Sequence, residues 1–266
     1  MQRHRHLKNL FIFLVFLFLY LPIITLIVFS FNTSPLNILF EGFTLEWYGK
    51  LFSNTTLLEA LKNTIIVSVV STGISTFIGT LAAIGLQKYN FVGKNFINKL
   101  LYVPVVIPEI VLGISLLSVY TLLKLNLGLG TLIVSHIAFS IPFVIISVRT
   151  VLNSTNLQIE EAAHDLGAND FKTLTNVIIP EIMPGIISGA TLAFTLSLDD
   201  VIISYFTAGP GSNTLPLQIY AMIKTGITPD VNALTTLMIL VIMTVLIISS
   251  LIQVRKMKKE YARWKR

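Results

Sequence analysis

Six long apolar segments constrain this chain more than any other feature of its sequence. A helix that crosses the hydrocarbon core of a membrane needs about 20 apolar residues. The sequence supplies six such runs, at residues 10–31, 64–86, 100–123, 129–148, 182–208 and 233–251. Hydrophobic residues make up 54% of the chain and charged residues only 12%, which excludes a soluble globule. The sequence therefore predicts an all-α fold, a polytopic membrane helix bundle of six transmembrane helices.

Lysine and arginine are distributed unequally between the two sides of these segments. Cytoplasmic flanks of membrane helices collect basic residues, and 15 of the 19 Lys and Arg residues fall on one side. We therefore expect both termini and the loop at 153–181 in the cytoplasm. The expected regions are an N-terminal helix with an outer loop (1–62), a core of five helices (63–252) and a basic tail (253–266). The tail is interpreted as an anchor on membrane lipid, and no nucleic acid partner is expected.

The first apolar segment follows a basic stretch, as the core of a signal peptide would. Its apolar run is longer than that of a signal peptide and no small-residue cleavage pattern follows it, so we expect it to be retained. The chain has no cysteine, which excludes disulfides, thiolate metal sites and cysteine nucleophiles.

The loop at 153–181 contains a polar pattern that predicts two short helices around a glycine. Residues 161–166 suit a helix on which Ala162 and Ala163 allow close approach of a partner, and Gly167 suits the left-handed position that ends it. Asn169 is expected to cap a second helix that Pro180 closes. Such a turn could dock on another protein, and the alternative is an ordinary solvated loop.

Three carboxylates lie within the apolar segments, namely Glu109, Asp199 and Asp200. A charge at membrane depth costs at least ~2.5–3.5 kcal/mol, so it normally faces water or a cationic partner. No Lys or Arg lies at comparable depth, which leaves the negative charge uncompensated within the chain and favours a cationic substrate. The alternative is that the aspartates cap a helix break or pair with another subunit.

Aromatic and histidine side chains near these acids have less specific interpretations. The ring faces of Tyr205 and Phe206 could hold a cation, although packing against lipid or protein is the simpler role of each ring. His136 is a single histidine in an apolar segment and is expected to be a satisfied core group.

Prolines and glycines mark breaks and close contacts in the apolar segments. Pro104 and Pro108 are expected to break the third segment and Pro142 the fourth, because each removes a backbone donor. Gly185 and Gly189 form a spacing suited to close helix contact.

Familiar enzymatic motifs are absent from the sequence. There is no G-x-x-x-x-G-K-[ST] loop, no H-E-x-x-H and no G-x-S-x-G, so the chain is not expected to bind ATP through a P-loop or to be an enzyme. Energy for transport would have to come from a partner or from a gradient.

Several of these stretches resemble one family. The pattern at 161–167, continued by Val177, Ile179 and Pro180, is similar to the EAA loop of the membrane subunits of bacterial ABC importers. Residues 103–114, 141–143, 196–200, 206–210, 215–220 and 232–234 look like the PotC-type permeases of spermidine/putrescine importers. The resemblance covers most of the chain from Trp47 to Leu251.

The resemblance implies a non-catalytic transport subunit in a bacterial cytoplasmic (inner) membrane. Its expected partners are a homologous PotB-type permease, a dimer of PotA-type ATPases and a PotD-type polyamine-binding protein. The chain itself binds no cofactor, since ATP and Mg belong to the ATPase. The implied substrate-binding residues are Glu109, Asp199, Asp200, Tyr205 and Phe206, and the implied ATPase-coupling residues are Glu161, Ala162, Ala163, Gly167 and Pro180.

Two alternatives to a polyamine importer remain open at this stage. One is an ABC permease for another small solute, because related permeases share the scaffold. The other is a gradient-driven cation carrier that uses Asp199 or Asp200 as its protonation site.

Overall fold

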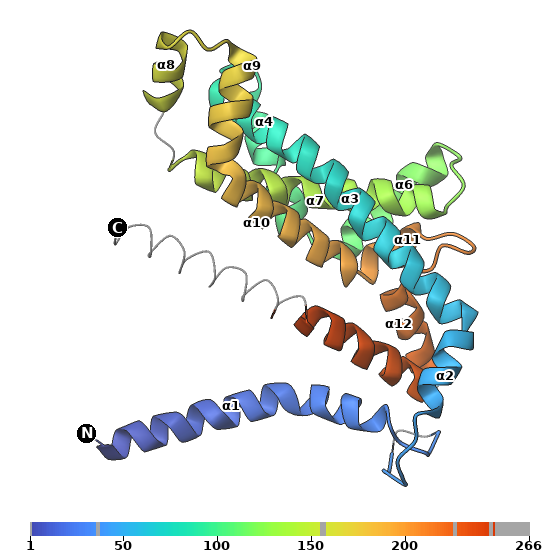
Figure 1. Ribbon diagram of the computed structural model, residues 1–266. Coiled ribbons are helices and arrows are strands. Elements are labelled where there is room, and N and C mark those ends of the chain that lie inside the picture. The colour runs from blue at the N-terminus through green and yellow to red at the C-terminus, as the bar shows by residue number, and fades with distance from the viewer. Residues whose placement is uncertain (1, 36–37, 155–157, 226–227, 245–246, 248–266) are drawn as a thin grey trace. The chain divides into compact units, whose positions relative to one another are not determined.

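The computed structural model describes residues 2–35, 38–154, 158–225, 228–244 and 247. Within these residues the regular structure is helical, apart from one isolated bridge between Asn32 and Phe43. The predicted basic tail at 253–266 lies outside the described residues. The helices are α1 Gln2–Phe29, α2 Glu46–Ser53, α3 Thr55–Lys88, α4 Lys94–Leu100, α5 Val103–Val106, α6 Glu109–Leu122, α7 Leu129–Leu152, α8 Gln158–Asp165, α9 Asp170–Thr173, the π-helical turn η1 Leu174–Ile178, α10 Ile179–Leu198, α11 Ile202–Thr207, α12 Leu215–Thr225 and an unlabelled helix Pro229–Thr244 (Figure 1).

Four described helices are long and apolar enough to cross a membrane, at Lys8–Phe29, Thr55–Lys88, Leu129–Leu152 and Asp170–Leu198. A fifth span results if the bent pair Lys94–Val106 and Glu109–Leu122 is counted as one. The sixth predicted segment, 233–251, extends beyond the described residues, and its described part belongs to the shorter apolar helix Pro229–Thr244. The fold is therefore an all-α membrane fold with four or five spans among the described residues.

The third predicted span is broken as its prolines indicate. Its two parts differ in direction by 110°. Ile107, the residue before Pro108, adopts the extended conformation that a following proline favours, and α6 begins at Glu109. Pro104 causes no break, because it lies in the first turn of α5, where its missing N–H would have no helical partner.

Pro142 does not interrupt its segment, contrary to the sequence-based expectation. Helix α7 continues through it from Leu129 to Leu152. Pro142 is buried and the helix packs closely against α10, and neighbouring helices are the setting in which a membrane helix tolerates a lost backbone donor.

Pro180 does not close the second helix of the loop either. It lies in the first turn of α10, and the helical course runs without interruption from Asp170 to Leu198. The π-helical turn η1 immediately precedes it and shifts the backbone hydrogen-bond pattern. We infer that this shift lets the helix accommodate a residue with no N–H.

The chain divides into two compact units. The second unit, Glu59–Ala221, contains α7 and α10 side by side with α3 (Figure 1). A Cβ added at Gly185 would lie 2.9 Å from Val151 Cγ2, and one at Gly189 would lie 3.1 Å from Val144 Cα. This confirms the close helix contact predicted from their spacing. The core between the three helices consists of Ala83, Leu86, Val144, Ile145, Val148, Ile182 and Ala193.

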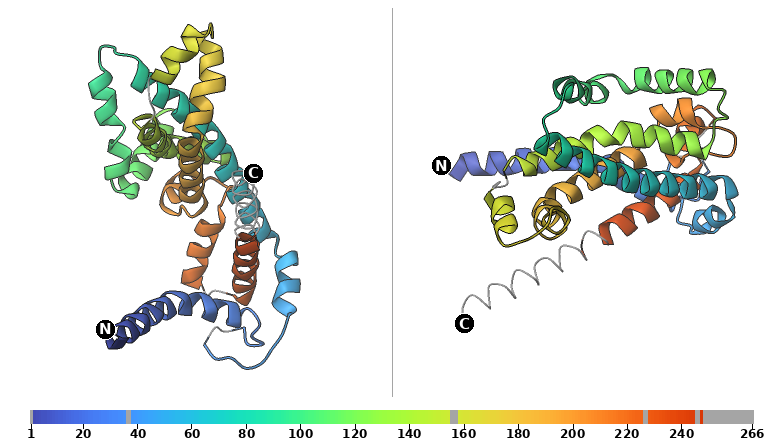
Figure 2. Two further views of the ribbon diagram at one scale, coloured as in Figure 1. Left: turned by 60° about the vertical axis from the view of Figure 1, so that its left-hand side comes forward. Right: turned by 90° about the horizontal axis from the view of Figure 1, so that it is seen from above.

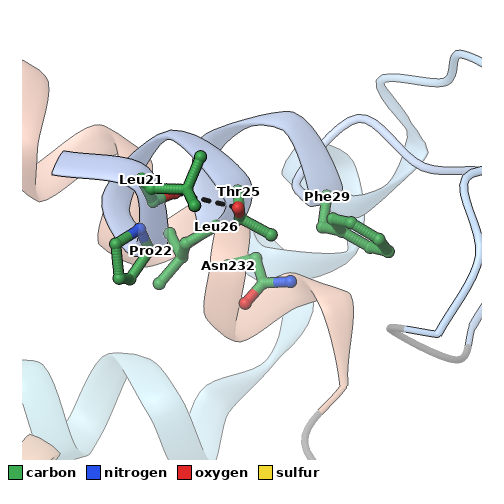
Figure 3. A pocket seen from close by; sticks show the side chains of 6 residues that line it. All are labelled: Leu21, Pro22, Thr25, Leu26, Phe29 and Asn232. Atoms are coloured by element: carbon green, nitrogen blue, oxygen red, sulfur yellow. Dashed lines mark hydrogen bonds between the residues drawn. The ribbon is translucent and has the colours of Figure 1, made fainter. Parts of the chain in front are cut away.

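The first unit comprises residues up to Leu58 and from Met222 onward. Its loop after α1 is organised by Asn32, whose Nδ2 donates to Leu39 O at 2.7 Å and whose carbonyl accepts from Trp47 Nε1 at 2.6 Å. A mainly apolar groove of about 430 Å³ in this unit is lined by Leu21, Pro22, Thr25, Leu26, Phe29 and Asn232 (Figure 3). The groove contains none of the predicted site residues.

Candidate functional site

The first candidate site is the break between α10 and α11. Helix α10 ends at Leu198 and α11 begins at Ile202, so Asp199 and Asp200 lie in the short linker. Asp200 stabilises the start of α11, because Oδ1 accepts from Ile203 N at 3.1 Å and Oδ2 from Ser204 N at 2.7 Å. These are first-turn N–H groups that have no partner within their own helix. The capping role considered for the aspartates therefore holds for Asp200.

The two aspartates have different environments. Asp200 is only 8% exposed, and its Oδ2 also accepts from Ser204 Oγ at 2.7 Å. Asp199 is exposed. The carboxylate of Asp200 is thus occupied by the protein itself, whereas that of Asp199 is exposed.

The third predicted acid, Glu109, lies near this break. This residue is exposed at the first position of α6, and the charges of Asp199 and Asp200 act on it. Helix α11 packs against α6, as the orange and green helices in the right view of Figure 2 show. We call Glu109, Asp199 and Asp200 the acidic cluster. The three acids, predicted in two separate apolar segments, are thus near enough for their charges to act on one another.

The two predicted aromatic residues both belong to α11, and they differ in how far their rings are exposed. Phe206 packs on α6, since a Cβ added at Gly113 would lie 2.7 Å from its Cδ2. Tyr205 is 59% exposed, and its ring meets that of Phe206 edge-on at 5.3 Å. Phe206 therefore packs α11 against α6, and Tyr205 is the ring that remains exposed.

His136 is the residue at this site whose contribution the sequence did not reveal. It is a buried, satisfied group, as predicted, with Nδ1 2.7 Å from Ser197 Oγ and Nε2 3.2 Å from Ser204 Oγ. Its Nε2 also lies 3.4 Å from Asp200 Oδ2. Asp200 thus has a histidine neighbour within the chain, although no Lys or Arg lies at comparable depth. No local pattern in the sequence signalled this contact, because it joins two apolar segments that are distant in the chain.

The second candidate site is the turn formed by α8 and α9, which Figure 1 shows at the opposite end of α10 from α11. Gly167 has a φ of +84°, as predicted, and its N–H donates to His164 O at 2.8 Å. The N–H of Ala168 donates to Ala163 O at 3.0 Å, which completes a Schellman ending of α8. Asn169 Oδ1 accepts from Lys172 N at 2.9 Å and caps α9, as predicted.

The surface of this turn combines small, charged and apolar groups. Glu161 and Ala162 are exposed and Ala163 is half-buried. Leu166 is 90% exposed and Phe171 72%, which leaves two large apolar side chains uncovered in an otherwise polar turn. An ion pair between Glu160 and Lys88 attaches α8 to the end of α3. The turn is thus an ordered surface on which two large apolar side chains are exposed.

An apolar helical chain with broken spans and a gathered set of acids defines a polytopic membrane protein of the transporter class. The chain belongs to the family of binding-protein-dependent transport system inner membrane components, which matches residues 75–259. The predicted permease subunit of an ABC importer, a transport component and not an enzyme, is confirmed by this membership.

Individual relatives agree with the family. The chain is 42% identical to the spermidine/putrescine transport system permease protein PotC of Escherichia coli K12, over 96% of each chain. It is 35% identical to the putrescine transport system permease protein PotI of the same strain, over 84% of this chain and 82% of that one. A bacterial ABC transporter involved in the import of the polysaccharide alginate shares the fold, with a TM-score of 0.72 and 18% identity over 93% of this chain and 96% of that one.

Proposed function

We propose that the chain is one membrane subunit of an ATP-driven importer for polyamines such as spermidine and putrescine. The observation that carries this proposal is the acidic cluster, in which Glu109 and Asp199 are exposed and Asp200 adds charge from a buried position. Polyamines are flexible chains with several ammonium groups, so two or three carboxylates from different segments are a fitting complement. The 42% identity with a spermidine/putrescine permease along nearly the whole chain supports the same substrate class.

Asp199 and Glu109 are the groups that contact the cation in this proposal. Both are exposed, and the charge of Asp199 acts on Glu109, so one extended polyamine can contact both carboxylates. Tyr205 can add a cation–π contact through its exposed ring. Asp200 and Phe206 instead hold the linker and α11 in place.

The turn of α8 and α9 serves as the ATPase-coupling surface, the EAA loop. Ala162 and Ala163 offer small side chains next to the charge of Glu161, and Gly167 fixes the turn that presents them. Leu166 and Phe171 supply the apolar contacts that a docking surface needs. Pro180 takes part only indirectly, since it lies within the helix that leads from this turn.

The assembly proposed around the chain follows from the family. A homologous PotB-type permease supplies the other half of the pathway, a PotA-type ATPase dimer binds ATP and Mg, and a PotD-type protein delivers the polyamine from outside. The chain crosses the bacterial cytoplasmic membrane six times, with both termini and the α8–α9 turn in the cytoplasm, as its basic residues indicate.

Uptake by the reconstituted four-component complex tests the proposal. Vesicles with ATP on the ATPase side should accumulate radiolabelled spermidine even when an ionophore collapses the proton gradient. Asp199→Asn with Glu109→Gln should abolish most uptake, whereas Glu59→Gln, a control on the same unit, should leave it unchanged. Uptake that follows the proton gradient and ignores ATP would establish a gradient-driven carrier. Accumulation of a different solute but no polyamine would establish an importer for another substrate.

A further inference from the structure

The break between α10 and α11 is bridged by one buried imidazole ring. His136 belongs to α7 and is 1% exposed. Its Nδ1 meets Ser197 in the last turn of α10, and its Nε2 meets Ser204 of α11. The ring therefore contacts both sides of the linker that contains Asp199.

The hydrogen bonds around this ring fix the direction of one of them. Ser204 Oγ donates its proton to Asp200 Oδ2 at 2.7 Å, because a carboxylate can only accept. The same hydroxyl can then only accept from His136, so Nε2 carries a proton and donates it. In the neutral ring Nδ1 is the acceptor and receives the proton of Ser197 Oγ. The donors and acceptors on both sides of the break are thereby matched.

This network continues to a further helix. Ser197 Oγ also lies 3.2 Å from Ser71 Oγ on α3, and both serines are buried. The end of α10, the start of α11, α7 and α3 are therefore connected through buried side chains. A buried network in which every member has a partner holds a single geometry, since any displacement leaves a polar group unpaired.

We propose that His136 is a positioning residue for the acidic cluster. By tying Ser197 to Ser204 and Asp200, it fixes the path of the linker and thus the direction in which Asp199 is presented to a substrate. The inference rests on the proposed function, in which Asp199 is a cation-binding group. It adds that the site's geometry is set by a histidine that contacts no substrate.

The absence of native cysteine allows a test that needs no substrate. Asp199→Cys is introduced in the complete complex in nanodiscs, with the other subunits made cysteine-free. The labelling rate by a positively charged methanethiosulfonate reagent is measured with His136 intact and with His136→Leu. We expect the rate at position 199 to change about fivefold or more, the effect of about 1 kcal/mol on a local equilibrium. Val92→Cys, fully exposed in the loop between α3 and α4, should label at the same rate in both backgrounds.

Two milder variants protect the test against loss of folding. Ser204→Ala removes the hydroxyl between the ring and Asp200 but keeps the backbone bond to that carboxylate. His136→Gln keeps an amide donor for Ser204. Ser204→Ala should shift the labelling rate in the same direction as His136→Leu, and His136→Gln should shift it less.

Transport kinetics supply the second readout. With Asp199 intact, His136→Leu should raise the KM for spermidine about tenfold and leave the maximal rate nearly unchanged, because weakened binding appears in KM. Combined with Asp199→Asn it should add nothing, since both changes remove one function.

The outcomes separate the two proposals. An unchanged labelling rate at position 199 in intact complexes with His136→Leu or Ser204→Ala would overturn the positioning role, and so would equal changes at positions 199 and 92. If the rate shifts only at position 199 while Asp199→Asn imports spermidine with a normal KM, the positioning role stands and the substrate assignment is wrong.

Discussion

Replacing the two aspartates of the linker by alanine, one at a time, should have different effects. Asp200→Ala should lower the stability of the protein, and Asp199→Ala should weaken substrate binding without changing stability. Asp200→Ala removes the acceptor of Ile203 N, Ser204 N and Ser204 Oγ in a buried setting. Hydrogen bonds to a charged group contribute about 1.5–3 kcal/mol each. Removing the charge also relieves its desolvation cost, which offsets part of the loss. A net destabilisation of about 3 kcal/mol is expected, in the upper part of the range for single substitutions.

Thermal unfolding of the purified complex measures this difference. For a chain of this size about 1 kcal/mol shifts Tm by about 2–4 °C, so Asp200→Ala should lower the Tm of the subunit by about 6–12 °C. Asp199→Ala should leave Tm unchanged, because its side chain is exposed, yet should raise the KM for spermidine. Equal Tm shifts for the two variants would refute the assignment of separate roles. A normal Tm with lost uptake for Asp200→Ala would show that Asp200 contacts the substrate directly.

Three further predictions concern the α8–α9 turn and the helix packing. Gly167→Val should weaken ATPase association in pull-down assays, because φ there is +84°, whereas Gly49→Ala should not. Lys88→Glu should impair ATP-driven uptake, and the added Glu160→Lys should restore part of it if their ion pair positions α8; no restoration would argue against that role. Gly189→Leu should reduce the amount of assembled complex seen by size-exclusion chromatography, because even an added Cβ would lie 3.1 Å from Val144 Cα; normal assembly would contradict the close packing.

Local signals in the sequence predicted the α8–α9 turn well. The left-handed conformation of Gly167 and the cap by Asn169 each depend on a few adjacent residues, and both were confirmed. Proline effects were predicted less well, because they depend on surroundings. Pro108 breaks its segment, Pro142 is tolerated within a packed helix, and Pro180 is accommodated by the preceding π-helical turn.

The acidic cluster was recognised only in part for the same reason. All three acids could be identified from the sequence, because a charge within an apolar segment is energetically costly. Their separate roles could not, because those roles depend on contacts between distant residues. His136 and Asp200 are far apart in sequence, and the residues around each give no indication that the two side chains are in contact. Burial and hydrogen bonding distinguish Asp200 from Asp199, and no property of two adjacent aspartates in a sequence does so.

The two candidate sites are linked by one continuous helical course. It begins after Asn169 and ends before Asp199, and its 29 residues span about 43 Å at 1.5 Å per residue. No loop intervenes between the turn at its start and the linker at its end. Beyond Leu198 the backbone helix stops, and the connection to α11 depends on side chains, those of Asp200, Ser204 and His136. The histidine network therefore joins α10 to α11 at the point where the backbone helix ends.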